Sequence, residues 1–207
     1  MKEWLWLAAA FLSGSVPYSL ILGKLLLRQD IRRFGDGNPG ATNFIRAGGG
    51  WWGALAILLD GLKAAIPVGL VYWTVRPPFL WMTLIALAPV VGHAYSPFLR
   101  GKGGKAIASI FGVWTGLTLF EAPLILGFSM AAFYLIFENS GWVVVFSQTL
   151  LGVYLWMYHP DPLLGVVWVM LFVLSVWKHR EDLRQRSFIR GGLKERLSRI
   201  LKRSAYH

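Results

Sequence analysis

Long apolar segments constrain this chain more than any other feature of its sequence. They recur along most of its 207 residues and contain few charged side chains. A helix of about 20 apolar residues crosses the hydrocarbon core of a bilayer, which is about 30 Å thick. Hydrophobic residues make up 56% of the chain, and its mean hydropathy is +0.52. A soluble domain could not bury so many apolar runs, so the sequence predicts an all-α integral membrane protein.

Seven membrane spans are predicted, joined by short polar turns. The apolar run 106–137 would be about 48 Å long as one helix, so we divide it into two short spans at Glu121-Ala122-Pro123. The first span contains small residues and a proline at 13–17, which a bundle tolerates when neighbouring helices cover them. The predicted spans are residues 5–27, 51–75, 79–95, the two halves of 106–137, 142–158 and 163–177.

The distribution of basic residues predicts the orientation of this bundle. Ten of the 21 Lys and Arg residues lie from Lys178 onward, and the turns after the first and third spans are also basic. Basic segments favour the cytoplasmic side of a membrane. Seven spans put all three basic regions on that side, with the N-terminus outside and the C-terminus inside. We therefore expect a multi-pass protein of the cell (inner or plasma) membrane.

Composition divides the chain into a seven-span domain, residues 1–178, and a basic cytoplasmic tail, residues 179–207. In the tail, Leu193, Leu197, Ile200 and Leu201 recur at helical spacing among basic residues. This pattern is typical of an amphipathic helix on an anionic membrane surface, and we also expect short interfacial helices in the cytoplasmic loops. Nucleic acid is not an expected partner, because no aromatic–basic RNA motif accompanies the charge. The chain has no cysteine, which excludes disulfides and thiolate chemistry.

Two glycine-rich basic turns are candidate sites for a phosphate-bearing ligand. The first is residues 35–43 (Gly-Asp-Gly-Asn-Pro-Gly-Ala-Thr-Asn), followed by Arg46, and the second is residues 102–105 (Lys-Gly-Gly-Lys). Glycines allow backbone N–H groups to face an anion, and neighbouring cations add charged donors. The second turn lacks the spacing of a Walker loop. The alternative interpretation is that both turns only fix the orientation of the protein in the membrane.

Asp60 and Lys63 lie three residues apart inside the second predicted span, and so on one face of its helix. Ionisable residues within a membrane are often functional. The competing interpretation is a buried ion pair that fixes the position of the helix. Ser140, in a short cytoplasmic turn, is a candidate donor to a ligand.

Two histidines lie where an apolar span meets the cytoplasm. His93 ends the third span before the second basic turn, and His179 ends the seventh. A histidine there can act as a general base, donate to a phosphate, or cap a helix. Asp182 follows His179 by three residues and could orient its imidazole. The sequence contains neither a zinc-ligand cluster nor a Gly-x-Ser-x-Gly elbow, so we expect no metal and no cofactor.

These stretches together resemble the bacterial acyl-phosphate-dependent glycerol-3-phosphate acyltransferases, the integral-membrane PlsY family. The matching stretches are residues 37–43 with Arg46, residues 60–63, residues 92–105 and residues 179–182. The resemblance implies a seven-helix enzyme with a cytoplasmic active site. Its substrates would be acyl phosphate and glycerol 3-phosphate, and its products 1-acylglycerol 3-phosphate (lysophosphatidate) and phosphate, in the first step of phospholipid biosynthesis. It implies no metal. Membrane lipids are expected partners, and no obligate protein partner is evident.

The resemblance also assigns roles to individual residues. It implies that the first basic turn holds phosphate or glycerol and that the lysines of the second hold a phosphate. The implied catalytic residues are His179, Lys105, Ser140 and Asp182. The implied substrate-binding residues are Arg46, Gly37, Asn38, Gly40, Thr42, Asn43, Lys102, Gly103, Gly104, His93, Asp60 and Lys63.

The chain departs from the family pattern close to this site. Asp36 replaces the usual serine, Asp182 the usual asparagine and Gln185 the usual arginine. An acid beside a phosphate needs a neutralising cation, for which we expect Arg32 or Arg33. These departures leave open a catalytically weakened paralogue. An organic-phosphate transporter that uses the same basic turns without chemistry is a further alternative.

Overall fold

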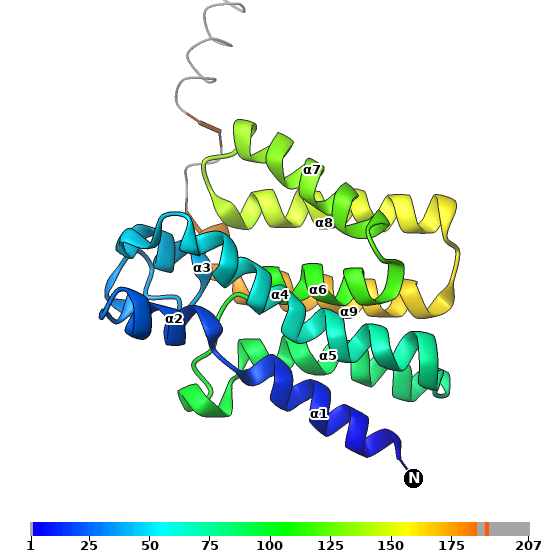
Figure 1. The fold of residues 1–207 in the computed structure, drawn as a ribbon. Helices are drawn as coiled ribbons and strands as arrows, with labels where there is room; N and C mark the ends of the chain where they lie inside the picture. The colour runs from blue at the N-terminus through cyan, green and yellow to red at the C-terminus, as the bar shows by residue number, and fades with distance from the viewer. Residues whose placement is uncertain (1, 186–188, 191–207) are drawn as a thin grey trace, which may run out of the picture.

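A computed structural model describes residues 2–185 and 189–190 of the chain. These residues form a bundle of helices (Figure 1), and their only β-type pairing is an isolated bridge between Phe137 and Ile189. The prediction of an all-α fold is confirmed. The predicted amphipathic helix in the tail lies outside the described residues.

The described residues form seven long helical units that follow one another along the chain. The first unit contains two helices, and the second ends in a π-helical turn. The units are α1 (Glu3–Ser15) with α2 (Tyr18–Leu26), α4 (Trp52–Leu70) with η3 (Val71–Val75), α5 (Phe79–Ala94), α6 (Ile107–Thr118), α7 (Glu121–Ile136), α8 (Ser140–Tyr158) and α9 (Pro162–Lys178). Short helices lie in the connections: η1 (Ile31–Arg33), α3 (Ala41–Phe44), η2 (Ile45–Gly49), η4 (Pro97–Leu99) and α10 (Arg180–Leu183).

Four helical segments of the described chain are long and apolar enough to cross a membrane: Glu3–Leu26, Trp52–Val75, Phe79–Leu99 and Ser140–Tyr158. Helices α6, α7 and α9 have 12, 16 and 17 residues, fewer than the roughly 20 of a straight crossing. The length and composition of the helices thus support a membrane protein. The count of seven crossings and the interfacial location of the short helices stay predictions.

The apolar run 106–137 is divided as predicted, but the break lies just before Glu121-Ala122-Pro123, which form the first turn of the second helix. Helix α6 ends at Thr118 and α7 begins at Glu121. Between them, Leu119 has a φ of +57° and a ψ of −114°, which lies outside the α-helical region and ends α6. The Thr118 hydroxyl accepts a hydrogen bond from the Ala122 amide at 3.3 Å, which satisfies one of the free N–H groups at the start of α7.

Glycines allow two helix pairs to approach at backbone distance. A Cβ on Gly112 of α6 would lie 2.1 Å from the carbonyl oxygen of Gly61 on α4. A Cβ on Gly14 of α1 would lie 2.1 Å from the carbonyl oxygen of Pro89 on α5. Small residues at such contacts are typical of helix packing in lipid, where close van der Waals contact replaces the hydrophobic effect.

The break between α1 and α2 is held by the buried ion pair of α4. Lys63 Nζ lies 2.7 Å from Asp60 Oδ1 and donates at 2.7 Å to the carbonyl oxygen of Val16, which the break leaves without a helical partner. The Ser19 hydroxyl of α2 donates to Asp60 Oδ2 at 2.5 Å. Because the two charged groups pair with each other and with the broken helix, these contacts support the interpretation that Asp60 and Lys63 fix the position of a helix.

The loops of the bundle gather at two opposite ends (Figure 1). The N-terminus and the connections α4–α5, α6–α7 and α8–α9 lie at one end. The connection from α2 to α4, the connection from α5 to α6 and the segment after α9 lie at the other. This second end contains both glycine-rich basic turns and His179.

Candidate active site

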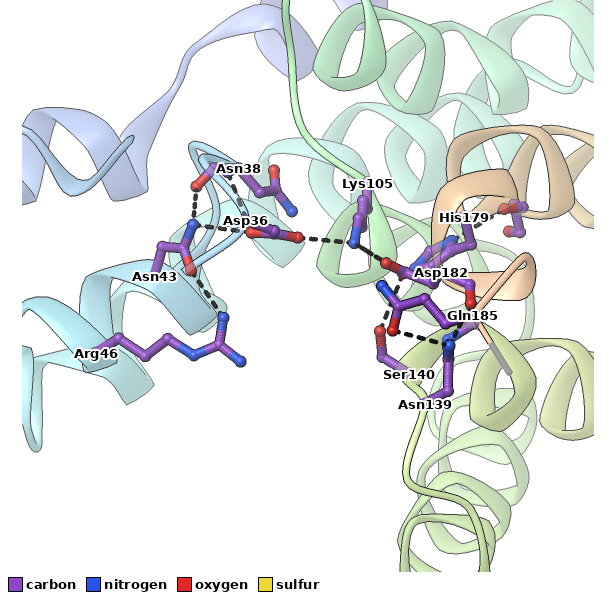
Figure 2. Close-up of polar contacts among 12 residues, drawn as sticks. Asp36, Asn38, Asn43, Arg46, Lys105, Asn139, Ser140, His179, Asp182 and Gln185 are labelled. Atoms are coloured by element: carbon purple, nitrogen blue, oxygen red, sulfur yellow. Dashed lines mark hydrogen bonds and ion pairs between the residues drawn. The ribbon is translucent and has the colours of Figure 1, made fainter. Parts of the chain in front are cut away.

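Three segments that are far apart in the sequence meet at the side chain of Lys105 (Figure 2). Its Nζ lies 2.7 Å from Oδ2 of Asp36 in the first basic turn. It also donates to Oδ1 and Oδ2 of Asp182 in α10, at 3.0 and 2.8 Å. The two basic turns and the segment after α9 therefore form one cluster.

Charge, rather than burial, decides the protonation of this cluster. Burial disfavours the carboxylate of Asp36, but the hydrogen bond and positive charge of Lys105, with the hydrogen bonds from Asn38 and Asn43, outweigh it and hold the pKa of Asp36 below its ordinary value. Burial also disfavours the ammonium of Lys105, but the carboxylates of Asp182 and Asp36 outweigh it and raise the pKa of Lys105. Both Asp36 and Lys105 are therefore charged at neutral pH.

The cation that neutralises Asp36 is not the one that the sequence predicts. We expect Arg32 or Arg33 from their proximity in sequence, but Lys105 takes this place. Arg32 Nη2 instead lies 2.6 Å from Asp30 Oδ2. The Asp30 side chain also caps η1 by accepting from the Arg32 amide, so the local turn holds these two residues together.

Asn43 holds the first basic turn in shape. Its Nδ2 donates to Asp36 Oδ1 at 2.9 Å and to the Asn38 carbonyl at 3.0 Å, and its Oδ1 accepts from Arg46 Nη1 at 3.1 Å (Figure 2). Gly35 adopts a φ of +57°, and a Cβ there would lie 2.4 Å from Asn43 Oδ1. The turn thus needs glycine at residue 35. Arg46 is exposed, and its guanidinium has donors left for a ligand.

The other residues of this turn that the sequence predicts to bind substrate have different environments. Gly37 has a φ of +74°, where the chain reverses. Thr42 is exposed on α3, which Gly40 precedes. The Oδ1 atom of Asn38 is buried and has no hydrogen-bond partner within the described residues. That oxygen is available to a ligand or a water molecule.

The glycines of the second turn have a packing role that the sequence does not predict. A Cβ on Gly103 would lie 2.0 Å from the His93 carbonyl oxygen, and a Cβ on Gly104 2.3 Å from His93 Nε2. These two glycines let the turn cross the end of α5 directly. His93 is buried behind the turn, and its Nδ1 lies 3.9 Å from Asp60 Oδ1. Lys102, in contrast, is exposed.

His179 is oriented by its own helix. Its Nδ1 lies 2.9 Å from the carbonyl oxygen of Ser175, one turn earlier, and a carbonyl can only accept. Burial lowers the pKa of His179, so the ring is neutral at pH 7 and its Nε2 holds a free lone pair. The prediction that Asp182 orients this ring is wrong, because the Asp182 carboxylate pairs with Lys105 instead.

Ser140 and Asn139 attach the start of α8 to the same cluster. The Ser140 hydroxyl donates to Asp182 Oδ2 at 3.1 Å. Asn139 Nδ2 donates to the Asp182 carbonyl and, at 3.4 Å, to Gln185 Oε1. Asn139 also caps α8 by accepting from the Gly141 amide at 2.8 Å. Sequence reasoning missed Asn139, although an asparagine before a helical segment is an N-cap signal.

The fold and the site define a class of protein: an all-helical membrane protein with a cluster of charged side chains at one end of its bundle. Comparison with known families agrees with this class. Residues 4–187 match the family model for glycerol-3-phosphate acyltransferase, and the chain belongs to this family. The resemblance that the sequence motifs indicate is thereby confirmed.

Two relatives show the extent of the similarity. Glycerol-3-phosphate acyltransferase 1 of Thermotoga maritima is 34% identical over 189 residues, which cover 84% of this chain and 93% of that protein. Glycerol-3-phosphate acyltransferase of Desulfovibrio desulfuricans is 35% identical over 193 residues, covering 88% and 81%. The similarity therefore extends over most of both proteins.

Solved structures extend the similarity to the fold. The crystal structure of PlsY (YgiH), an integral membrane glycerol 3-phosphate acyltransferase, in its glycerol 3-phosphate form has a TM-score of 0.81 and 26% identity. The match covers 94% of this chain and 98% of that chain. Its lysophosphatidic acid form has a TM-score of 0.81, 25% identity and coverages of 93% and 97%. This chain is accordingly an integral membrane protein.

Proposed function

We propose that this protein transfers a fatty acyl group from acyl phosphate to glycerol 3-phosphate, giving 1-acylglycerol 3-phosphate and phosphate. One observation carries the proposal beyond family membership: Lys105 joins both basic turns and the segment after α9 in one cluster. Both substrates carry a phosphate, which suits two cationic turns. The helices in lipid offer an apolar surface for the acyl chain.

The geometry suggests how the residues would share this reaction. The exposed guanidinium of Arg46 and the ammonium of Lys102 would hold phosphate groups, with Asn38, Thr42 and Asn43 shaping the turn. The lone pair of His179 Nε2 would accept the proton of the attacking hydroxyl. Lys105 would stabilise negative charge on the acyl carbonyl oxygen.

The reaction needs no covalent intermediate, because acyl phosphate is already activated. The glycerol hydroxyl oxygen would attack the acyl carbonyl carbon, and the bond from that carbon to the phosphate oxygen would break. The phosphate would leave with the bonding electrons, and the hydroxyl proton would pass to His179. Positioning and charge stabilisation would then supply most of the rate enhancement.

We further propose that the cluster faces the cytoplasm, with seven crossings, the N-terminus outside and the C-terminus inside. Residues 1–178 would form the catalytic domain, and residues 179–207 a basic cytoplasmic tail on the membrane surface. The basic residues of the two turns and the tail support this orientation.

An acylation assay that compares donors tests the activity. Purified protein would receive glycerol 3-phosphate with acyl phosphate, acyl-CoA or acyl carrier protein as donor. Lysophosphatidate and phosphate should form only when acyl phosphate is the donor. The variants Lys105→Ala and His179→Ala should lose this activity. Product from acyl-CoA but not from acyl phosphate would contradict the donor assignment.

A catalytically weakened enzyme is the second candidate, because the ammonium of Lys105 is already paired with the carboxylates of Asp36 and Asp182. It would give slow acylation that rises when Asp36→Ser and Asp182→Asn are combined. Uptake of labelled glycerol 3-phosphate into proteoliposomes without an acyl donor would instead support the transporter alternative.

A further inference from the structure

The ammonium of Lys105 is shared by two carboxylates that come from separate segments. Asp36 Oδ2 lies 2.7 Å from Lys105 Nζ, and Asp182 Oδ2 lies 2.8 Å from it. The side chains of Asp36, Lys105 and Asp182 are 41%, 22% and 14% exposed. This carboxylate clamp, Asp36 with Asp182 around Lys105, puts two negative charges beside one positive charge at the centre of the site.

Such a clamp affects phosphate ligands differently from hydroxyl groups. A phosphate dianion next to Lys105 must compete with both carboxylates and is repelled by them. A hydroxyl group can donate a hydrogen bond to either carboxylate, and such charge-assisted bonds are short and strong. The clamp therefore favours a ligand whose hydroxyl groups, rather than its phosphate, lie beside Lys105.

The clamp has room for such a hydroxyl group. Asp36 Oδ1 already accepts from Asn43 Nδ2 and from the Asn38 amide, whereas its Oδ2 faces only Lys105 among the described residues. A carboxylate offers about four lone-pair positions. Asp36 is also the more exposed of the two acids. The phosphate of the same ligand would then lie at the exposed guanidinium of Arg46, on the other side of Asn43 (Figure 2).

We propose that Asp36 and Asp182 are specificity-determining residues that select a phosphate ester bearing free hydroxyl groups over inorganic phosphate. The inference rests on the proposed function, because the ester is then the acyl acceptor and inorganic phosphate the product. Rejection of free phosphate at Lys105 would help the site to release that product. Specificity of this kind comes from repulsion of the wrong ligand as well as attraction of the right one.

Direct binding measurements test the selection without any acyl donor. Isothermal titration of the full chain in detergent, at pH 7.5, would give dissociation constants for inorganic phosphate and for glycerol 3-phosphate. In Asp36→Ser/Asp182→Asn, inorganic phosphate should bind about tenfold more tightly, because two repulsive charges are gone. Glycerol 3-phosphate should gain much less, since it loses hydrogen bonds from its hydroxyl groups.

Matched variants separate this effect from general charge and from misfolding. Glu181→Gln removes one negative charge next to Asp182 in the sequence, from a side chain that is 83% exposed and pairs with Arg180, and should leave both constants unchanged. Asp36→Asn keeps the shape of the side chain and replaces the double variant in the binding measurement if the double variant unfolds. Asp36→Asn should also bind inorganic phosphate more tightly than the wild type does, but by a smaller factor than the double variant.

Equal tightening of both ligands, or no tightening of inorganic phosphate in any Asp36 or Asp182 variant, would overturn the selection. The acylation assay decides the proposed function separately. A wild-type protein that makes no lysophosphatidate from any donor, while the binding preference still changes as expected, would refute the reaction and leave the selection standing.

Discussion

The Nδ1 atom of His179 lies 2.9 Å from the carbonyl oxygen of Ser175, its neighbour one helical turn earlier. This contact fixes the tautomer of a buried ring and leaves Nε2 as its acceptor. The orientation of the candidate base therefore comes from the end of α9 itself rather than from an acidic partner.

The protonation of His179 should follow from this environment. Its lowered pKa means that the ring binds a proton only below the ordinary histidine value of 6.5. Since the unfolded chain binds that proton more readily, the free energy of unfolding should fall as the pH drops below 6.5. Nuclear magnetic resonance of ¹⁵N-labelled histidine, with His179→Gln to assign the signal, should show an Nδ1-protonated ring at pH 7. A titration at or above pH 6.5 would refute this prediction.

Loss of the ammonium at Lys105 should remove activity. Lys105→Ala deletes the cation that would stabilise negative charge on the reacting acyl carbonyl oxygen, and kcat/KM should fall by about 100-fold or more. Arg100→Gln removes a positive charge from the same loop, at a residue outside the cluster, and should have a much smaller effect. If the two variants lost equal activity, only the overall charge of the loop would matter.

The buried ion pair of α4 should contribute to stability. Lys63→Ala leaves Asp60 buried without its cation and should lower the free energy of unfolding by about 3–5 kcal/mol. The variant Asp60→Asn/Lys63→Met removes both charges and should lose less than Lys63→Ala. Denaturant unfolding in detergent measures both values. A double variant as unstable as Lys63→Ala would show that the loss does not come from the unpaired charge of Asp60.

The contact between α4 and α6 should tolerate no added side chain. Gly112→Ala places a Cβ against the Gly61 carbonyl and should cost about 1–3 kcal/mol of stability. Gly165→Ala in α9 is the matched control, because a Cβ there meets no atom within 4 Å. Thermal unfolding of the two variants should differ clearly, and an unchanged melting temperature for Gly112→Ala would contradict the packing.

The proposed orientation in the membrane can be tested with single cysteines, since the natural chain contains none. Membrane-impermeant thiol reagents on intact cells should label Arg76→Cys. They should label Arg46→Cys and Lys102→Cys only after the membrane is made permeable. Labelling of residues 46 and 102 from opposite sides of the bilayer would end the proposal of one phosphate site.

Much of the architecture is determined by local sequence. Hydropathy predicts the helical segments, Pro17 accompanies the break in the first one, and the turn before Glu121 divides the run 106–137. These features can be predicted because burial in lipid and helix termination act over a few neighbouring residues. The same is true of the two basic turns, whose glycines and cations are adjacent in the sequence.

The sequence by itself thus determined an all-helical membrane protein with glycine-rich basic turns and the motifs of its family. Only the tertiary structure decided that Lys105 pairs with Asp36 and Asp182, and that Asn139 joins them. Proximity in the sequence suggested other partners for both acids. The physical reason is that an ion pair forms with whichever opposite charge the packed helices bring within about 4 Å, and hydropathy carries no information about that distance.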